Sequence, residues 1–276
     1  MLLPYLKMQG AGNQIVVVDQ RADDHPPPSA EEIRRLGHGG TGPGFDQLMW
    51  VGPASSNEAV ASYRVFNRDG SEVEQCGNGV RCVAWALARD IGMRDVFFLD
   101  SPAGPVEAVV LDDGRVSVSM GAPQFEPARI PFVADEVKLL YALQACGRSY
   151  NVSVLSMGNP HCVLRVDSIA SADVDRLGPA IEEHPQFPEA TNVGFMSVED
   201  RSNIELRVWE RGVGETLACG TGACAAVVAG QRLDLLDEDV SVRLPGGQLV
   251  VSWPGADASV WLTGDVEFIS EGTIDL

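Results

Sequence analysis

Two cysteines stand in matching surroundings in the two halves of this sequence, and they are the residues best suited to catalysis. Cys76 opens the stretch Cys-Gly-Asn-Gly, and Cys219 opens Cys-Gly-Thr-Gly 143 positions later. Each follows a strand-like run and precedes an Ala- and Val-rich segment that is expected to be helical. The first turn of a helix presents unpaired N–H groups, which bind anions and favour a thiolate. The sequence therefore predicts two thiols, each held at the start of a helix.

Two such helix starts suit chemistry on the two faces of a single carbon. We expect the backbone at Gly77, Asn78, Gly220 and Thr221 to hold a carboxylate, with one sulfur on each side of its α-carbon. One thiolate would remove the α-proton while the opposite thiol delivers another, which inverts the centre. The helix N-termini would stabilise the charge that grows on the carboxylate.

No cofactor is expected for this reaction. Enzymes that remove the α-proton of an amino acid commonly use pyridoxal phosphate as an electron sink. The chain has two lysines, Lys7 and Lys138, and neither lies in a glycine-rich phosphate loop. Cys76 and Cys82 are six positions apart, which places them on different faces of a helix, so a shared metal ion is not expected either. The remaining cysteines are interpreted as small buried apolar residues: Cys82, Cys146, Cys162 and Cys224.

Short apolar runs bounded by Gly, Pro and Asp-Gly dominate the chain and predict a strand-rich protein. Strands are expected over residues 14–19, 63–67, 96–99, 106–111, 116–120, 153–156, 161–166, 204–209, 240–244, 249–253 and 259–263. Helices are expected over residues 29–36, 77–91, 133–145, 171–183 and 220–236.

An internal duplication relates the two halves of the chain. Asn67 and Glu210, Arg68 and Arg211, and Glu72 and Glu215 share the 143-residue offset of the cysteines. Several matches in one order at nearly one offset indicate a repeat rather than chance. The Pro- and Gly-containing loop 121–127 is the expected boundary. We expect an N-terminal half of residues 1–121 plus 265–276 carrying Cys76, and a C-terminal half of residues 122–264 carrying Cys219.

Composition excludes several classes of function. The net charge of −19 argues against nucleic acid and anionic membrane surfaces as partners, because both need clustered Lys and Arg. No apolar run is long enough for a transmembrane helix, and the N-terminus does not match a secretory signal. Six cysteines in a chain of 276 residues are typical of reduced cytoplasmic thiols.

Five separated motifs in the right order resemble the diaminopimelate epimerase family. They are Asn67-x-Asp-Gly-Ser-Glu72, Gln75-Cys-Gly-Asn-Gly79, Met157-Gly-Asn-Pro-His-Cys162, Glu210-Arg-Gly212 and Ala218-Cys-Gly-Thr-Gly222. The resemblance covers nearly the whole chain. It implies an α/β (α+β) fold of two pseudo-symmetric halves, each a curled β-sheet around a central helix, with the active site in the cleft between them. It also implies a cytoplasmic homodimer that interconverts LL- and meso-diaminopimelate without a cofactor, in the synthesis of lysine and peptidoglycan precursors.

The resemblance also assigns roles to residues of this chain. Cys76 and Cys219 match the catalytic acid/base pair, and His161 and Glu210 match residues that tune the thiols. The positions matching substrate contacts are Asn13, Gln47, Asn67, Gly77, Asn78, Asn159, Asn192, Glu210, Arg211, Gly220 and Thr221. Arg211 suits a second carboxylate, because a guanidinium binds it bidentately. Arg68 departs from the family pattern, which has a small residue there, and we expect it to face solvent.

Two other functions compete with this one. A related two-cysteine racemase would act on proline or hydroxyproline, but a ring of amides with Arg211 fits a small cyclic substrate poorly. A dithiol redox protein would use Cys76 and Cys219 as a disulfide pair. Exchange of solvent deuterium into diaminopimelate, and not into proline, separates these possibilities.

Overall fold

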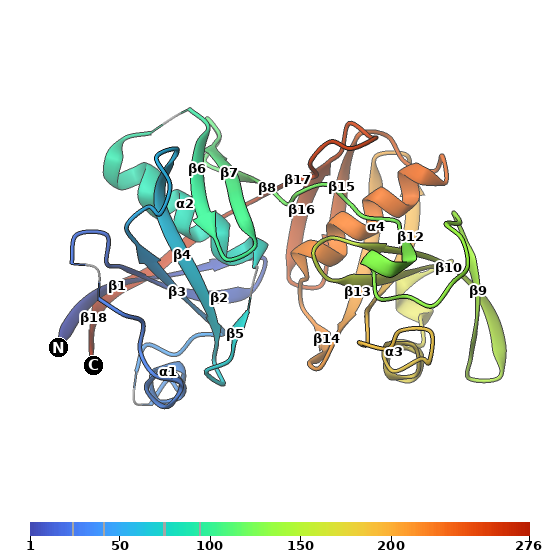
Figure 1. Cartoon of the computed structure of the whole chain (residues 1–276), viewed down its shortest axis with the longest axis horizontal. Helices are drawn as coiled ribbons and strands as arrows, with labels where there is room; N and C mark the ends of the chain where they lie inside the picture. The colour runs from blue at the N-terminus through green and yellow to red at the C-terminus, as the bar shows by residue number, and fades with distance from the viewer. Residues whose placement is uncertain (24, 41, 74–75, 94) are drawn as a thin grey trace. The chain divides into compact units, whose positions relative to one another are not determined.

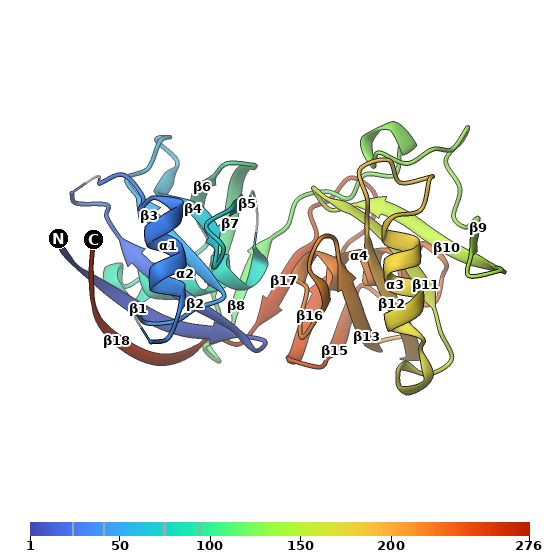
Figure 2. The ribbon, with the colours of Figure 1, turned by 90° about the horizontal axis from the view of Figure 1, so that it is seen from below.

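The chain folds into two units in a computed structural model that describes residues 1–23, 25–40, 42–73, 76–93 and 95–276. The first unit comprises Met1–Ser119 with Thr263–Leu276, and the second comprises Met120–Leu262. Figures 1 and 2 show the two units from two directions.

The first unit combines two helices with a mixed β-sheet. Its helices are α1 (Ala30–Gly37) and α2 (Gly77–Ile91). Its strands are β1 (Leu2–Gly10), β2 (Asn13–Asp19), β3 (Gln47–Gly52), β4 (Ala59–Asn67), β5 (Glu72–Val73), β6 (Phe97–Ser101), β7 (Gly104–Val110), β8 (Val116–Ser119) and β18 (Glu267–Asp275).

In the second unit, the helices and strands from β10 to β17 repeat the order of those from β1 to β8 in the first, and β9 precedes them. Its helices are α3 (Val174–Glu182) and α4 (Gly220–Arg232), with 3₁₀ turns at Pro127–Arg129 and Ile169–Ser171. Its strands are β9 (Tyr141–Ala145), β10 (Arg148–Ser156), β11 (Pro160–Arg165), β12 (Asn192–Asp200), β13 (Asn203–Glu210), β14 (Gly214–Thr216), β15 (Asp239–Leu244) and β16 (Gly247–Ser252). Strand β17 (Trp261–Gly264) contains the point where the chain returns to the first unit.

The strand pairings confirm the duplication. In the first unit β1–β2 and β3–β4 are antiparallel, whereas β2–β3 and β4–β6 are parallel. In the second unit β10–β11 and β12–β13 are antiparallel, whereas β11–β12 and β13–β15 are parallel. A helix fills each parallel crossover, as such connections require: α1 and α2 in one unit, α3 and α4 in the other. Each unit therefore carries one copy of the same fold.

A central helix lies inside the curled sheet of each unit, as the sequence resemblance implied. Helix α2 contacts β1, β2, β3, β7 and β8, and helix α4 contacts β10 to β13 and β16. Figure 1 shows both helices, α2 in teal and α4 in orange, surrounded by strands. From Ala223 to Gly230 every residue of α4 is buried, which explains its Ala- and Val-rich sequence: small side chains allow strands to pack closely all round the helix.

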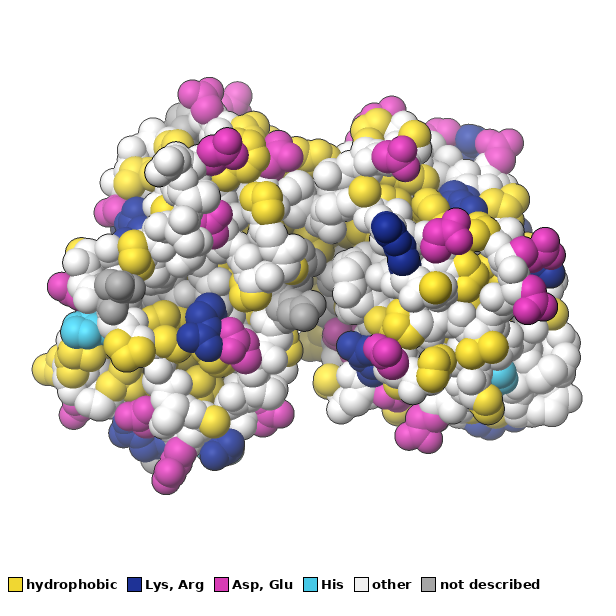
Figure 3. All heavy atoms as spheres, in the orientation of Figure 1, with side chains coloured by type: hydrophobic (Ala, Val, Ile, Leu, Met, Phe, Trp, Pro, Cys, Tyr) yellow, Lys and Arg dark blue, Asp and Glu magenta, His cyan; other side chains and the backbone are white. Residues whose placement is uncertain are grey.

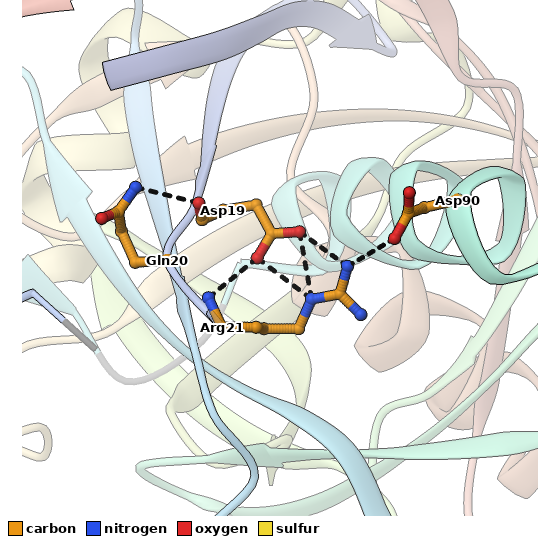
Figure 4. A network of polar contacts seen from close by, with 4 residues as sticks. All are labelled: Asp19, Gln20, Arg21 and Asp90. Carbon is orange, nitrogen blue, oxygen red and sulfur yellow. Dashed lines mark hydrogen bonds and ion pairs between the residues drawn. The ribbon is translucent and has the colours of Figure 1, made fainter. Parts of the chain in front are cut away.

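The far end of α2 is tied to the end of β2 by charged side chains. Arg21 Nε lies 3.0 Å from both carboxylate oxygens of Asp19, and Arg21 Nη2 lies 2.7 Å from Asp90 near the end of α2 (Figure 4). Helix α2, whose N-cap is Cys76, is thus anchored at its C-terminal turn.

One predicted helix is wrong. Residues 133–145 were expected to be helical, but residues 133–140 have no regular structure and Tyr141–Ala145 forms β9. Tyr141, Leu143 and Ala145 are buried and alternate with exposed residues, which is the period of a strand. Val133 and Leu139 are 59% and 50% exposed, so the apolar residues before β9 do not form the core-facing stripe of a helix.

The surface carries the excess acidity of the chain. On the face in Figure 3, Asp and Glu side chains are dispersed over both units, several of them beside Lys or Arg. Among the described residues, no helix is long and apolar enough to cross a membrane.

Candidate active site

Both cysteines occupy the N-cap position of the central helix of their unit. Cys76 has φ −147° and ψ 102°, and Cys219 has φ −125° and ψ 113°, so both are extended where the helix begins. The Val80 amide donates to the Cys76 carbonyl at 2.9 Å, and the Ala223 amide donates to the Cys219 carbonyl at 3.0 Å. The Gly79 amide lies 3.3 Å from Cys76 Sγ. The predicted placement of each thiol at a helix start is confirmed by this geometry.

In the first unit, three predicted side-chain amides form a chain that starts at the sulfur. Asn13 Nδ2 lies 3.9 Å from Cys76 Sγ and 3.2 Å from Gln47 Oε1. Gln47 Nε2 donates to Asn67 Oδ1 at 3.0 Å, and Asn67 Nδ2 donates to Ser71 Oγ at 3.1 Å. These amides come from the first residues of β2 and β3 and the last residue of β4, so the sheet edge brings them together.

Asn78 and Gly77 lie in the first turn of α2, immediately after Cys76. Asn78 is buried, and its Oδ1 accepts from Arg81 Nη2 at 2.8 Å. The side chain of Asn78 is therefore engaged within the helix, which leaves its backbone N–H as the group for the anion site that the sequence predicts.

In the second unit, a directed hydrogen-bond chain also ends at the sulfur. His161 Nε2 lies 3.0 Å from Asn159 Oδ1, Asn159 Nδ2 donates to Thr221 Oγ1 at 3.4 Å, and Thr221 Oγ1 lies 3.5 Å from Cys219 Sγ. Because Asn159 uses its NH₂ on Thr221, its oxygen faces the imidazole, which must then carry its proton on Nε2. In this chain the imidazole, the Asn159 NH₂ group and the Thr221 hydroxyl can therefore each donate toward the Cys219 sulfur.

Burial sets the protonation state of His161. It is 1% exposed, and its Nδ1 is buried without a hydrogen-bond partner among the described residues. Desolvation, together with the nearby positive charge of Arg211, lowers the pKa of His161 to about 3. His161 is therefore a neutral hydrogen-bond donor rather than a cation.

Cys219 departs from the expectation of a thiolate favoured by the helix start. It is 5% exposed, and burial followed by the negative charge of Glu210 raises the pKa of its thiol well above the ordinary value. Thr221 and the Gly222 amide oppose this shift but do not outweigh it. Desolvation disfavours the charged sulfur more than the helix N-terminus stabilises it, so Cys219 is a protonated thiol at neutral pH.

Glu210 is held in place by a residue that sequence reasoning did not single out. Thr216 Oγ1 on β14 donates to Glu210 Oε1 at 2.5 Å. The signal was present, since Thr216 directly follows Glu215, whose match with Glu72 revealed the repeat.

Arg68 and Arg211 hold equivalent positions but differ in what binds their guanidinium groups. Arg68 is 52% exposed and donates to Asp46 Oδ1 and the Phe45 carbonyl, both at 2.7 Å. Arg211 donates to a single backbone carbonyl, that of Glu189, at 3.1 Å. None of the ion pairs among the described residues involves Arg211. Its charge is therefore available for an anion, whereas that of Arg68 is neutralised.

Asn192 positions the backbone that carries Arg211. It is buried, its Nδ2 donates to the Pro160 carbonyl at 2.9 Å, and its Oδ1 accepts from the Arg211 amide at 3.0 Å. Asn192 begins β12 as Gln47 begins β3, so the two residues are equivalent in the repeat.

The remaining cysteines follow the prediction with one exception. Cys82, Cys162 and Cys224 are buried, but Cys146 is exposed, because it lies after the end of β9 in a turn with φ 50°. Over the described ranges, no cluster of three or more His, Cys, Asp or Glu residues could hold a metal ion.

Comparison with known proteins identifies the family. The family model described as Diaminopimelate epimerase matches residues 5–126 and 153–269. The chain belongs to the diaminopimelate epimerase family. It is 47% identical to the diaminopimelate epimerase of Ectopseudomonas mendocina (strain ymp), over 100% of both chains. It is 49% identical to that of Halorhodospira halophila (strain DSM 244 / SL1), over 99% of this chain and 95% of the relative.

Solved structures of more distant proteins share the fold. A hydroxyproline epimerase from Agrobacterium vitis, with bound trans-4-OH-L-proline, has a TM-score of 0.70 at 16% identity and covers 99% of this chain and 92% of its own. A Bacillus anthracis phenazine biosynthesis protein of the PhzF family has a TM-score of 0.68 at 16% identity, with 100% of both chains covered. The diaminopimelate epimerase family therefore has a fold in common with proteins named for other reactions.

Proposed function

We propose that this chain interconverts LL- and meso-diaminopimelate by proton transfer between the substrate's α-carbon and the thiols of Cys76 and Cys219. Membership of the family supports the reaction, and the repeated cap geometry of the two cysteines supports the mechanism. One thiol removes the α-proton and the other returns a proton to the opposite face. The product supplies lysine and peptidoglycan synthesis.

The reacting carboxylate is bound by backbone N–H groups of the two helix starts. Gly77 and Asn78 follow Cys76, and Gly220 and Thr221 follow Cys219, so each first turn offers donors beside its sulfur. As the α-proton leaves, negative charge moves onto the carboxylate oxygens, where these donors and the helix dipoles stabilise it. No group other than the chain's own is needed for this step.

The distal end of the substrate is recognised by Arg211 and by side-chain amides. Arg211 has no carboxylate partner in the described part of the chain, and its guanidinium can bind a second carboxylate bidentately. Asn67 and Asn159 supply amides for the distal ammonium and carboxylate, and Glu210 supplies a negative charge. A ligand with two amino-acid ends satisfies all of these groups, whereas proline leaves Arg211 unpaired.

Cys219 acts as the acid of the resting enzyme. Its burial and the neighbouring Glu210 favour the neutral thiol, so it is poised to donate a proton. Cys76 is then the base in that direction, and the roles exchange when the reaction runs in reverse.

We also propose that the enzyme is a cytoplasmic homodimer, as the sequence resemblance implied. Apolar side chains of the first unit provide a candidate interface: Ile91, Phe268 and Ile269 are 43%, 40% and 43% exposed. Phe268 stacks on Trp85 with 6.5 Å between ring centroids. Sedimentation velocity tests the dimer; a purely monomeric chain at micromolar concentration contradicts it.

Solvent deuterium exchange tests the proposed reaction. Stereochemically pure diaminopimelate, proline and hydroxyproline are each incubated with the enzyme in D₂O, and deuterium at the α-carbon is measured by mass spectrometry. We expect label in diaminopimelate alone. Label in proline or hydroxyproline, or disulfide turnover without exchange, contradicts the assignment. Cys82→Ala is the matched control, because Cys82 is buried on the same helix as Cys76 and has no role in the mechanism.

A further inference from the structure

An identical ion pair occurs in each unit, between the two strands that lead to the catalytic cysteine. Arg64 Nε and Nη2 donate to the two oxygens of Glu72, both at 2.7 Å. Arg207 Nε and Nη2 donate to the two oxygens of Glu215 at 2.6 and 2.7 Å. Arg64 and Arg207 are separated by the 143 positions that separate Cys76 and Cys219. The same bidentate geometry therefore exists in both copies of the repeat.

The surrounding hairpins are also duplicated residue by residue. Phe66 pairs with Glu72 between β4 and β5, and Trp209 pairs with Glu215 between β13 and β14. The connecting turns repeat as well: the Gly70 amide donates to the Asn67 carbonyl at 2.9 Å, and the Val213 amide donates to the Glu210 carbonyl at 3.1 Å. A surface ion pair that arose incidentally would not be expected in the same register of two diverged copies.

In the part of the chain that the structure describes, strand pairing within these hairpins is short. Among the described residues, β5 is two residues long and forms two residue pairs with β4, and β14 is three residues long and forms three with β13. Each carries a glutamate four positions before the cysteine that caps the central helix. A bidentate arginine–carboxylate contact fixes orientation as well as distance, which a single contact does not.

We propose that the pairs Arg64–Glu72 and Arg207–Glu215 are positioning residues that set the place of each catalytic thiol. This rests on the proposed function, since it assigns the pairs a purpose in two-thiol proton transfer. In the second unit, a series of contacts links the ion pair to the Cys219 sulfur. The pair holds β14 against β13, Thr216 on β14 binds Glu210 at the end of β13, and Glu210 acts on Cys219.

We expect the two ion pairs to affect the reaction rate more than the stability of the fold. The Arg64–Glu72 side chains are 47% and 38% exposed, and those of Arg207–Glu215 are 23% and 26% exposed. Ion pairs this close to solvent contribute little to folding. A displacement of about 1 Å at a reacting group, in contrast, can cost about 100-fold in rate. Breaking either pair should therefore slow the reaction without unfolding the protein.

The test compares Glu72→Gln and Glu215→Gln with the control Glu205→Gln in the full-length enzyme. Glu205 also lies on β13 and pairs with Arg243 on β15 at 3.0 Å, outside the part of β13 that pairs with β14. We expect kcat for diaminopimelate to fall roughly 10- to 100-fold in both hairpin variants, with KM within about threefold. The control should stay near wild type, and the melting temperatures of all three should match it.

Thiol alkylation gives a readout that does not depend on turnover. Iodoacetamide labelling with peptide mapping should change at Cys219 alone in Glu215→Gln, and at Cys76 alone in Glu72→Gln, because thiol reactivity follows access and ionisation. Equal changes at both cysteines, or hairpin variants that match Glu205→Gln in kcat, overturn the proposal. A wild-type chain without epimerase activity would defeat the proposed function, while the alkylation pattern would still decide the role of the pairs. Should a glutamine variant fail to fold, Arg64→Lys and Arg207→Lys carry the same expectations, because lysine keeps the charge but not the fork.

Discussion

Mild acid should destabilise the second unit through His161. The pKa of this imidazole is lowered to about 3 in the folded chain, mainly by desolvation, against about 6.5 for an unperturbed histidine. Between these two values the unfolded chain binds a proton that the folded chain does not. The free energy of unfolding must therefore decrease as the pH falls through this window.

The size of the effect follows from the two pKa values. At one pH unit below its pKa in the unfolded chain, such a group lowers the free energy of unfolding by about 1.4 kcal/mol. Lowering the pH from about 7.5 to about 5 should therefore reduce the free energy of unfolding by about 2 kcal/mol through His161 alone. At pH 5 the folded imidazole stays neutral, because that pH is still well above its pKa of about 3.

Urea denaturation of wild type, His161→Gln and His184→Gln at the two pH values measures this contribution. Glutamine can keep the hydrogen bond to Asn159 but cannot titrate. His161→Gln should lose about 2 kcal/mol less than wild type on acidification. His184, which contacts the Gln144 carbonyl at 3.1 Å in the same unit, is the control and should follow wild type. If His161→Gln loses as much as wild type, the imidazole is not held neutral by burial.

Two further substitutions test binding and packing. Arg211→Lys should raise KM at least about tenfold with kcat nearly unchanged, because the distal carboxylate does not react. The control Arg68→Lys should leave both constants near wild type. Equal steady-state constants for the two variants would place Arg211 outside the binding site. Gly79→Ala should destabilise the enzyme by about 1–2 kcal/mol in thermal denaturation, because steric overpacking exceeds the gain in helix propensity. A Cβ at Gly79 would lie 2.4 Å from the sulfur of buried Met49. Gly40→Ala is the control, because a Cβ there would meet no atom of the described residues within 4 Å beyond its chain neighbours. A Gly79→Ala protein as stable as this control would show that Met49 can move aside.

The sequence predicted the central helices well because their start signals are local. Helix α2 spans Gly77–Ile91 as expected, and α4 begins at Gly220 as expected, since an extended cap residue and a small first turn are encoded by adjacent residues. Helix α4 ends at Arg232 rather than at residue 236. Strands β1, β3, β5, β12, β14 and β18 were missed. β12 is buried over its first six residues, so it lacks the alternation that marks a half-buried strand.

The electrostatics of the site could not be read from the sequence. The helix start at Cys219 favours a thiolate, but the structure buries this sulfur and places Glu210 against it. Burial depends on elements that are distant in sequence, and it raises the pKa of the thiol, whereas the adjacent helix start favours a lower one. The mutual contacts of Asn13, Gln47 and Asn67 likewise arise because neighbouring strand ends meet at one sheet edge, although the family resemblance had named each residue singly.

The source of the hydrogen in the first product tests the two-thiol mechanism most directly. LL-diaminopimelate is converted in D₂O to less than about a tenth of equilibrium, and product and remaining substrate are separated and analysed for α-deuterium. Because one thiol removes the proton and the other supplies a solvent-derived one, nearly every meso product should carry one deuterium while the remaining LL substrate carries almost none. Cys76→Ala and Cys219→Ala should each abolish product formation. Product that retains the substrate hydrogen, or either variant turning over at a near-normal rate, would contradict proton transfer between two cysteines.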